Sequence, residues 1–170
     1  GGADPGYWAD LYLLPEREMG MVATSNVYCA SAWSVADAAM DIMLGLAPTK
    51  PKRPVTVPVG AVLKSAGQDA AIAEYRRLQF AAPDEYDFDE HHFSHTTGSA
   101  VWLQRPDAVM PLLHLRTALF PESSEAYEEL GEAYLIGGDM AAAERNLQTA
   151  LALDPESESI PKLMQRLESA

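Results

Sequence analysis

The sequence is poor in the features that mark disulfide-stapled, membrane-spanning or nucleic-acid-binding proteins. It has one cysteine, Cys29, so no disulfide can form within the chain. Its longest largely apolar stretch, residues 27–46, contains Asp37 and Asp41, which predicts no membrane span. Basic residues are few, since 12 Lys and Arg stand against 25 Asp and Glu, a net charge of −13. Such a surface repels phosphate groups, so we expect neither nucleic acid nor an anionic membrane as a partner.

Complete catalytic motifs are missing as well. The sequence contains no G-x-S-x-G, H-E-x-x-H, P-loop or C-x-x-C. One Ser-x-x-Lys runs from Ser159 to Lys162, a spacing that places a lysine one helical turn from a serine nucleophile. No Tyr-x-Asn or second lysine motif accompanies it, so we interpret it as part of a terminal helix. We predict that the chain uses no cofactor.

A histidine cluster, DFDEHHFSH, is the other candidate for chemistry. His91 and His95 are four residues apart and could share a metal on a helix, with Asp87 or Glu90 as an oxygen ligand. Two ligands at one spacing do not close a site, which needs three or four converging ligands. The alternative is a polar helix start, in which acids lie near the positive N-terminal end and His91, His92 and His95 face water. The sequence favours this alternative, and we predict no metal.

The composition predicts a folded protein with three regions. The 170 residues, 48% apolar and 22% charged, suffice for one domain or two small ones. Residues 48–58 contain four prolines and three basic residues, which is typical of an extended linker. We therefore divide the chain into residues 1–47, a linker at 48–58 and a mostly helical region at 59–170, and predict a mainly α fold.

The first region predicts a hairpin followed by a helix. Residues 7–14 and 19–24 are apolar runs joined by a polar turn, which indicates two antiparallel strands. Neither run alternates much between apolar and polar residues, so we expect cover on both faces of the sheet. A helix follows and ends near Gly45. We predict that its apolar stripe packs into a core, the stripe being Tyr28, Val35, Ala39, Ile42, Met43 and Leu46.

The last region contains an internal repeat. Pro121 and Pro155 lie 34 residues apart in the similar phrases LRTALFPES and LQTALALDPES. Small and large apolar residues between them are spaced as in the tetratricopeptide (TPR) pattern of two packed helices, which this segment resembles. Small side chains at Gly131 and Ala143 would let the two helices approach closely, and Pro155 ends the second. The residues of the pattern are Tyr127, Leu130, Gly131, Tyr134, Ala143, Leu147, Ala150 and Pro155.

Two weaker units precede this strong one, and a short helix follows it. The first unit begins near Val59 and turns at Gly67, and the second begins near Phe93 and has its second helix at about residues 108–120. Residues 160–167 predict the terminal helix that a repeat stack needs as a cap. Three units and a cap meet the minimum for a stable stack.

The opening, GGADPGYWADLYLLPEREMGMVATSN, resembles the end of the catalytic domain of β-lactamase-related serine hydrolases, the group of class C β-lactamases and related penicillin-binding proteins. The resemblance covers about residues 1–47. It implies that Gly2 is the glycine of a His- or Lys-x-Gly motif and that the backbone N–H of Ala3 forms half of an oxyanion hole. The His or Lys would precede Gly1, so we expect Gly1 to lie inside a longer parent chain.

Two interpretations follow. In the first, the chain is the C-terminal fragment of a serine hydrolase with a TPR-like tail, catalytically incomplete because nucleophile and base lie upstream. The resemblance then implies a parent exported to the periplasm or cell surface. In the second, the chain is a stand-alone interaction module without enzymatic activity. Either way we expect the helical repeats to bind a protein or peptide partner, and the acidic surface favours a basic one.

Overall fold

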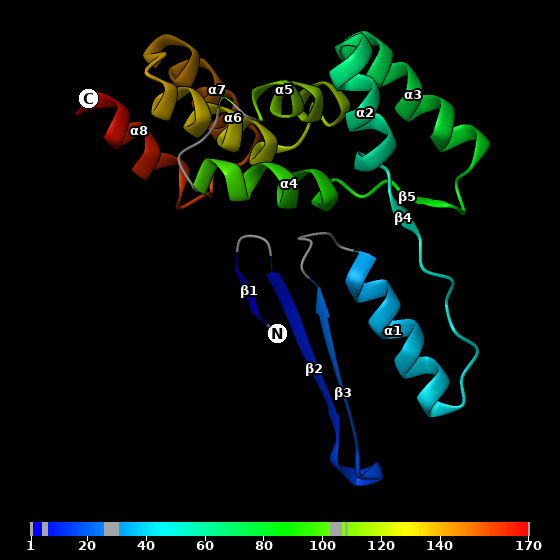
Figure 1. Cartoon of the computed structure of the whole chain (residues 1–170). Coiled ribbons are helices and arrows are strands. Elements are labelled where there is room, and N and C mark those ends of the chain that lie inside the picture. Colours follow the sequence, from blue (N-terminus) through cyan, green and yellow to red (C-terminus); the bar gives the residue numbers. More distant parts are fainter. Residues whose placement is uncertain (1, 5–6, 26–30, 103–106, 108, 170) are drawn as a thin grey trace. The chain divides into compact units, whose positions relative to one another are not determined.

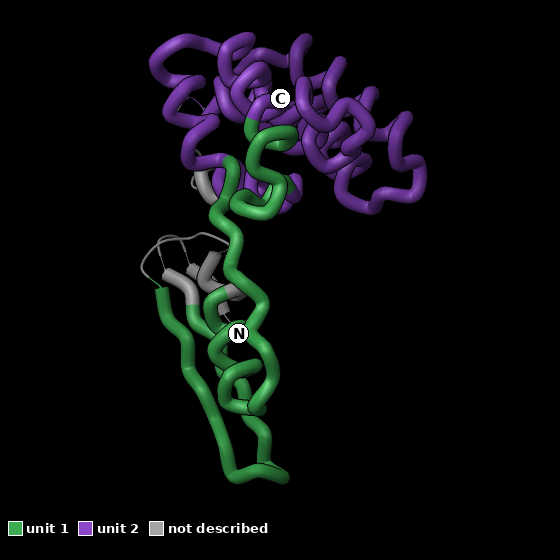
Figure 2. The backbone as a smooth tube through the Cα atoms, turned by 90° about the vertical axis from the view of Figure 1, so that its right-hand side faces the viewer, with its two compact units in different colours: residues 1–55, 78–88 green, residues 56–77, 89–170 purple. Residues whose placement is uncertain are grey.

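The computed structural model describes residues 2–4, 7–25, 31–102, 107 and 109–169, and it is mainly helical (Figure 1). The chain divides into two compact units, which are coloured separately in Figure 2. Unit 1 comprises residues 1–55 and 78–88, and unit 2 comprises residues 56–77 and 89–170. Tyr28 and Cys29, discussed above, lie outside the described residues.

Unit 1 contains a three-stranded antiparallel sheet in the order β1-β2-β3. The strands are β1 (Gly2–Asp4), β2 (Tyr7–Leu14) and β3 (Met19–Ser25). The predicted hairpin is confirmed, with Leu14 opposite Met19 and Leu11 opposite Val22. A short 3-10 turn, η1 (Pro15–Arg17), connects its strands. Glu18 then takes a left-handed conformation with φ of 54° and donates its N–H to the Pro15 carbonyl at 3.1 Å.

Helix α1 (Ser31–Leu44) packs against β3. The Tyr12 hydroxyl of β2 donates to Asp37 Oδ1 at 3.2 Å, which orients one side of the helix toward the sheet. Among the residues of α1 whose burial the structure describes, 35–44, Ala36 and Ala38 are buried. Small side chains let a helix lie close to its neighbours, which fits the burial of these two alanines.

The prediction that the large apolar stripe of this helix packs into a core is therefore wrong for most of its members. Val35, Ile42 and Leu46 are exposed by 57%, 63% and 57%. Met43 is exposed as well, and Ala39 is half-buried. The spacing of the residues identified the helix correctly, but it did not predict which of its side chains are buried.

The stretch predicted as a linker, residues 48–58, includes regular structure. Strand β4 (Arg53–Pro54) pairs in parallel with β5 (Tyr86–Asp87). Arg53 lies 2.8 Å from Glu85 and its guanidinium lies over the Tyr86 ring at 4.6 Å. Helix α2 begins at Thr56, before the last proline of the stretch. The boundaries at residues 47 and 58 stay predictions.

The helices of unit 2 follow one another as the three predicted pairs and a cap. Helix α6 contacts α4, α5, α7 and α8, as expected for consecutive pairs that stack side by side in a TPR-like arrangement. Helix α3 extends from unit 2 into unit 1. The helices are α2 (Thr56–Ala66), α3 (Gln68–Ala81), α4 (His91–Trp102), α5 (Met110–Leu119), α6 (Ser124–Gly137), α7 (Met140–Leu153) and α8 (Ile160–Glu168).

The α6–α7 pair forms as the sequence predicts. The Ser123 side chain caps the start of α6, and the Asp139 side chain caps the start of α7. Gly138 ends α6 with φ of +85°, a left-handed conformation that glycine adopts without a steric penalty. A Cβ on Gly131 would lie 2.8 Å from Leu147 Cγ, so the two helices can be this close only because residue 131 has no side chain.

Two apolar clusters and an aromatic group stabilise the stack. Leu113, Leu130 and Ala133 join α5 to α6. Tyr75, Phe93 and Phe120 lie with ring centroids 5.6–6.3 Å apart, in the tilted and edge-on geometries that aromatic rings favour. The second cluster joins α7 to α8 and consists of Leu147, Ala150, Ile160 and Leu163.

Candidate interaction surface

A buried arginine connects the last two helix pairs. Arg116 on α5 is fully buried. Its Nε donates to Glu90 Oε1 at 2.8 Å, and its terminal nitrogens lie 2.9 Å from Glu129 and 3.2 Å from Glu125. An arginine presents its N–H donors in a fixed fork, so several carboxylates can surround one guanidinium. The result is an ionic network between α5, α6 and the segment before α4.

Hydroxyl groups complete this network. Thr97 on α4 donates its hydroxyl to Glu129 Oε2 at 2.5 Å, and Ser123 donates to Glu90 Oε1 at 2.5 Å. Burial raises the pKa of Glu129, and the nearby Arg116 charge and the Thr97 hydrogen bond oppose that rise. The network therefore fixes the position of α6 relative to α4 and α5.

Helix α6 carries an acidic stripe, which we define as Glu125, Glu128, Glu129 and Glu132. These positions are spaced i, i+3, i+4 and i+7, so they lie on one face of the helix. That face meets both neighbouring helices, because Glu129 contacts Thr97 on α4 and Glu132 lies 3.1 Å from Arg166 on α8. Four carboxylates thus stand against two guanidinium groups, one of which is buried.

The histidine cluster lies at the start of α4. His91 donates its backbone N–H to Asp89 Oδ1 at 2.9 Å, and the Nε2 atoms of His91 and His95 contact each other. Burial first, and then the neighbouring imidazoles, lower the pKa of His95. Over the part of the chain that the structure describes, no group of three or more His, Cys, Asp or Glu side chains converges on a point where a metal could bind.

The other residues singled out by the sequence, Gly2, Ala3 and Ser159, lie in different elements of the structure. Gly2 and Ala3 lie in β1, opposite Ala9 and Trp8 of β2. Their part in an oxyanion hole stays a prediction. The Ser159 hydroxyl lies 3.0 Å from the Ser157 hydroxyl, at the start of α8.

Unit 1 exposes apolar residues on its sheet as well as on its helix. Leu11 and Leu13 of β2 and Val22 of β3 are 58–65% exposed. They alternate with half-buried residues, so they share the sheet face opposite α1. An exposed sheet face normally carries polar side chains, whereas this one carries large aliphatic residues.

Sequence reasoning missed both Arg116 and the acidic stripe. Arg116 stands within the otherwise largely apolar run MPLLHLRTALF, which is a signal that its charge needs a buried partner. The stripe could have been found from the helical spacing of the glutamates in SEAYEELGE.

No protein-family model matches the chain, and no curated protein sequence matches it. Solved structures of TPR domains do. The second TPR domain of human RPAP3, in complex with the HSP70 peptide SGPTIEEVD, has a TM-score of 0.46 and 15% identity, covering 67% of this chain and 92% of that one. The first TPR of Spaghetti (RPAP3), bound to the HSP90 peptide SRMEEVD, has a TM-score of 0.46 and 16% identity, covering 68% and 88%. The first TPR domain of human RPAP3 has a TM-score of 0.43 and 19% identity, covering 68% and 91%.

The TPR-like character of unit 2 rests on its own helix pairs and on the close approach at Gly131, as described above.

None of the helices that the structure describes is both long and apolar enough to cross a bilayer.

Proposed function

We propose that unit 2 is a protein-interaction module that binds a basic peptide segment along α6. The acidic stripe is the observation that carries this proposal. Its glutamates lie on the face of α6 that meets α4 and α8, where neighbouring repeats of a stack provide one continuous surface. The stripe has more carboxylates than guanidinium groups to neutralise them, so a lysine- or arginine-rich partner would complete its charge balance.

The negative charge of the acidic stripe also determines which peptides the module can select. The HSP70 and HSP90 peptides bound by the RPAP3 domains, SGPTIEEVD and SRMEEVD, are rich in acidic residues. An acidic peptide on the α6 stripe would place like charges side by side, which opposes binding. We therefore infer that this module selects a partner of the opposite charge.

A pair of matched peptides tests the proposal. We expect SRMEEVD with its three acidic residues replaced by lysine to bind the chain at least about tenfold more tightly than SRMEEVD itself, with an affinity that falls as salt increases. Fluorescence anisotropy of labelled peptides measures both affinities. Glu128→Lys, which reverses one charge of the stripe outside the Arg116 network, should weaken binding of the lysine peptide several-fold.

Glu158→Lys is the matched control. Glu158 is an exposed glutamate in the segment before α8, and replacing it with lysine changes the net charge by the same amount as Glu128→Lys. Equal binding of the acidic and lysine peptides, or equal weakening by Glu128→Lys and Glu158→Lys, would contradict the proposal. The second result would mean that net charge alone attracts the peptide.

The uncovered apolar surface of unit 1 favours a second candidate function for the chain as a whole. In this candidate, residues 1–47 are the end of a β-lactamase-related catalytic domain, and unit 2 is its interaction tail. Leu11, Leu13 and Val22 on the sheet, with Val35 and Ile42 on α1, would then contact the rest of that domain. By itself the chain should not hydrolyse nitrocefin above background, because nucleophile and base would lie upstream.

The coding sequence upstream of Gly1 tests this candidate directly. We expect a His or Lys codon immediately before Gly1, and Ser-x-x-Lys and Tyr-x-Asn motifs further upstream. A start codon or a signal-cleavage site at Gly1 would eliminate the hydrolase and leave the interaction module.

The exposed apolar face of the sheet also leads to a prediction that can be tested on the present chain. Leu11 and Val22 are cross-strand partners, so replacing both with threonine removes two adjacent members of this apolar face while keeping residues that favour strands. We expect the double variant to bind less of the dye ANS and to aggregate less than the wild type, with little change in its circular dichroism spectrum. Unchanged ANS fluorescence would show that this face is already covered in solution.

A further inference from the structure

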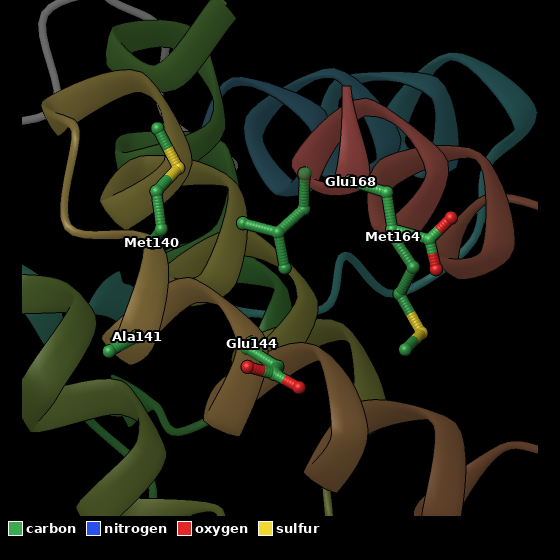
Figure 3. A pocket seen from close by; sticks show the side chains of 6 residues that line it. Met140, Ala141, Glu144, Met164 and Glu168 are labelled. Atoms are coloured by element: carbon green, nitrogen blue, oxygen red, sulfur yellow. The ribbon is translucent and has the colours of Figure 1, made fainter. Parts of the chain in front are cut away.

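A cleft of about 460 Å³ is lined by residues of α7 and α8 (Figure 3). Met140, Ala141 and Glu144 on α7 and Met164 and Glu168 on α8 border it from two sides. Leu167 completes its lining. Its volume is within the range of sites that bind ligands in proteins.

Part of the apolar surface of α7 and α8 stays accessible beside the buried cluster that joins them. Ile160 and Leu163 of α8 are buried against α7 in the second apolar cluster. Further along the same helix, Met164 and Leu167 are only half-buried, and Met140 on α7 is 39% exposed. The sequence predicts α8 as the cap of the stack, and a cap normally has a polar outer side, whereas the structure leaves part of the apolar surface of α8 open to the cleft.

Two carboxylates accompany this apolar surface. Glu144 and Glu168 are exposed residues, one on each helix. Glu144 Oε1 accepts a hydrogen bond from Gln148 Nε2 at 3.0 Å, which leaves its second carboxylate oxygen for a ligand. A ligand suited to this cleft therefore combines bulky apolar groups with a positive charge.

We propose that the cleft binds an amphipathic basic helix of a partner protein. An apolar side chain of that helix would lie between Met140 and Met164, and a lysine or arginine one turn away would pair with Glu144 or Glu168. Both walls of the cleft are helices, and a third helix packs into the groove between two others through its ridges of side chains. Methionine side chains adapt to differently shaped apolar partners, which suits a docking surface.

The cleft would be a second binding site, because its residues belong to α7 and α8 and none belongs to the acidic stripe of α6. It would allow the module to hold one partner along α6 and another at α8. Binding at the cleft does not depend on the peptide site of the proposed function. Variants of the acidic stripe and variants of the cleft therefore distinguish the two proposals.

The test uses a fluorescein-labelled amphipathic peptide that repeats leucine and lysine with a helical period, and the same peptide with glutamate in place of lysine. We expect the lysine form to bind the full chain and to gain helical circular dichroism on binding. Ala141→Trp fills the cleft from an exposed position and should weaken binding at least about tenfold. Glu144→Lys should weaken it several-fold, and Glu158→Lys should leave it unchanged.

Binding of the lysine peptide that Ala141→Trp and Glu144→Lys leave intact would overturn the proposal, as would equal binding of the glutamate peptide. Weakening by Glu128→Lys alone would place the peptide on the acidic stripe and would refute the cleft while leaving the proposed function intact. Ala141 and Glu144 are exposed, so both variants should fold, which the helical circular dichroism signal of each variant verifies.

Discussion

Replacing Arg116 with methionine should lower the free energy of unfolding by about 3–5 kcal/mol, because it leaves acidic groups in the protein interior without their counter-charge. Glu129 and Glu90, whose side chains are 16% and 25% exposed, lose the guanidinium that balances them. Methionine keeps much of the length and volume of the side chain, so the loss reports mainly on charge. Urea unfolding followed by helical circular dichroism measures it.

Two further variants make this prediction specific. Adding Glu90→Gln and Glu129→Gln to Arg116→Met removes the unpaired charges and should restore a good part of the lost stability. Arg166→Met removes an arginine that is 56% exposed and pairs with Glu132, and should change stability by less than about 1 kcal/mol. Similar losses for Arg116→Met and Arg166→Met would mean that the buried network contributes no more than a surface ion pair.

Leu147→Ala should destabilise the α6–α7 pair by about 2–5 kcal/mol, because it leaves a cavity beside Gly131 in the second apolar cluster. Gly131→Ala in the wild-type background should cost about 1–3 kcal/mol through overpacking, since its new Cβ would lie 2.8 Å from Leu147 Cγ and 2.9 Å from Leu147 Cδ2. Urea unfolding of both single variants and the double variant forms a double-mutant cycle.

In the double variant, the added methyl group occupies space that the shortened side chain has vacated. We therefore expect the double variant to be at least as stable as Leu147→Ala alone, with a coupling energy of about 1 kcal/mol or more. Additive losses would show that the helices separate to accommodate the new Cβ and that the close approach at residue 131 is not a fixed feature of the pair.

The sequence by itself determined the repeat units and the hairpin. Ser123, Gly138 and Asp139 act on the backbone within a few residues of themselves, so the ends of α6 and the start of α7 depend on the local sequence. The 34-residue spacing and the small residue at Gly131 then implied that two helices pack closely, and the contact between Gly131 and Leu147 agrees. Helix caps and a repeated residue pattern both depend on residues that are close together or regularly spaced in the sequence.

Only the tertiary structure decided which charged and apolar side chains are buried. The carboxylates around Arg116 come from positions before α4 and along α6, and no pattern near residue 116 specifies them. On α1 the structure buries Ala36 and Ala38 and joins Asp37 to Tyr12, whereas most of the large apolar stripe is exposed, against the expectation from the sequence. The cleft between α7 and α8 is lined in part by Met164 and Leu167, which stay half-buried beside the cluster that joins the two helices. Burial depends on what another segment places opposite a side chain, and helical spacing alone does not contain that information.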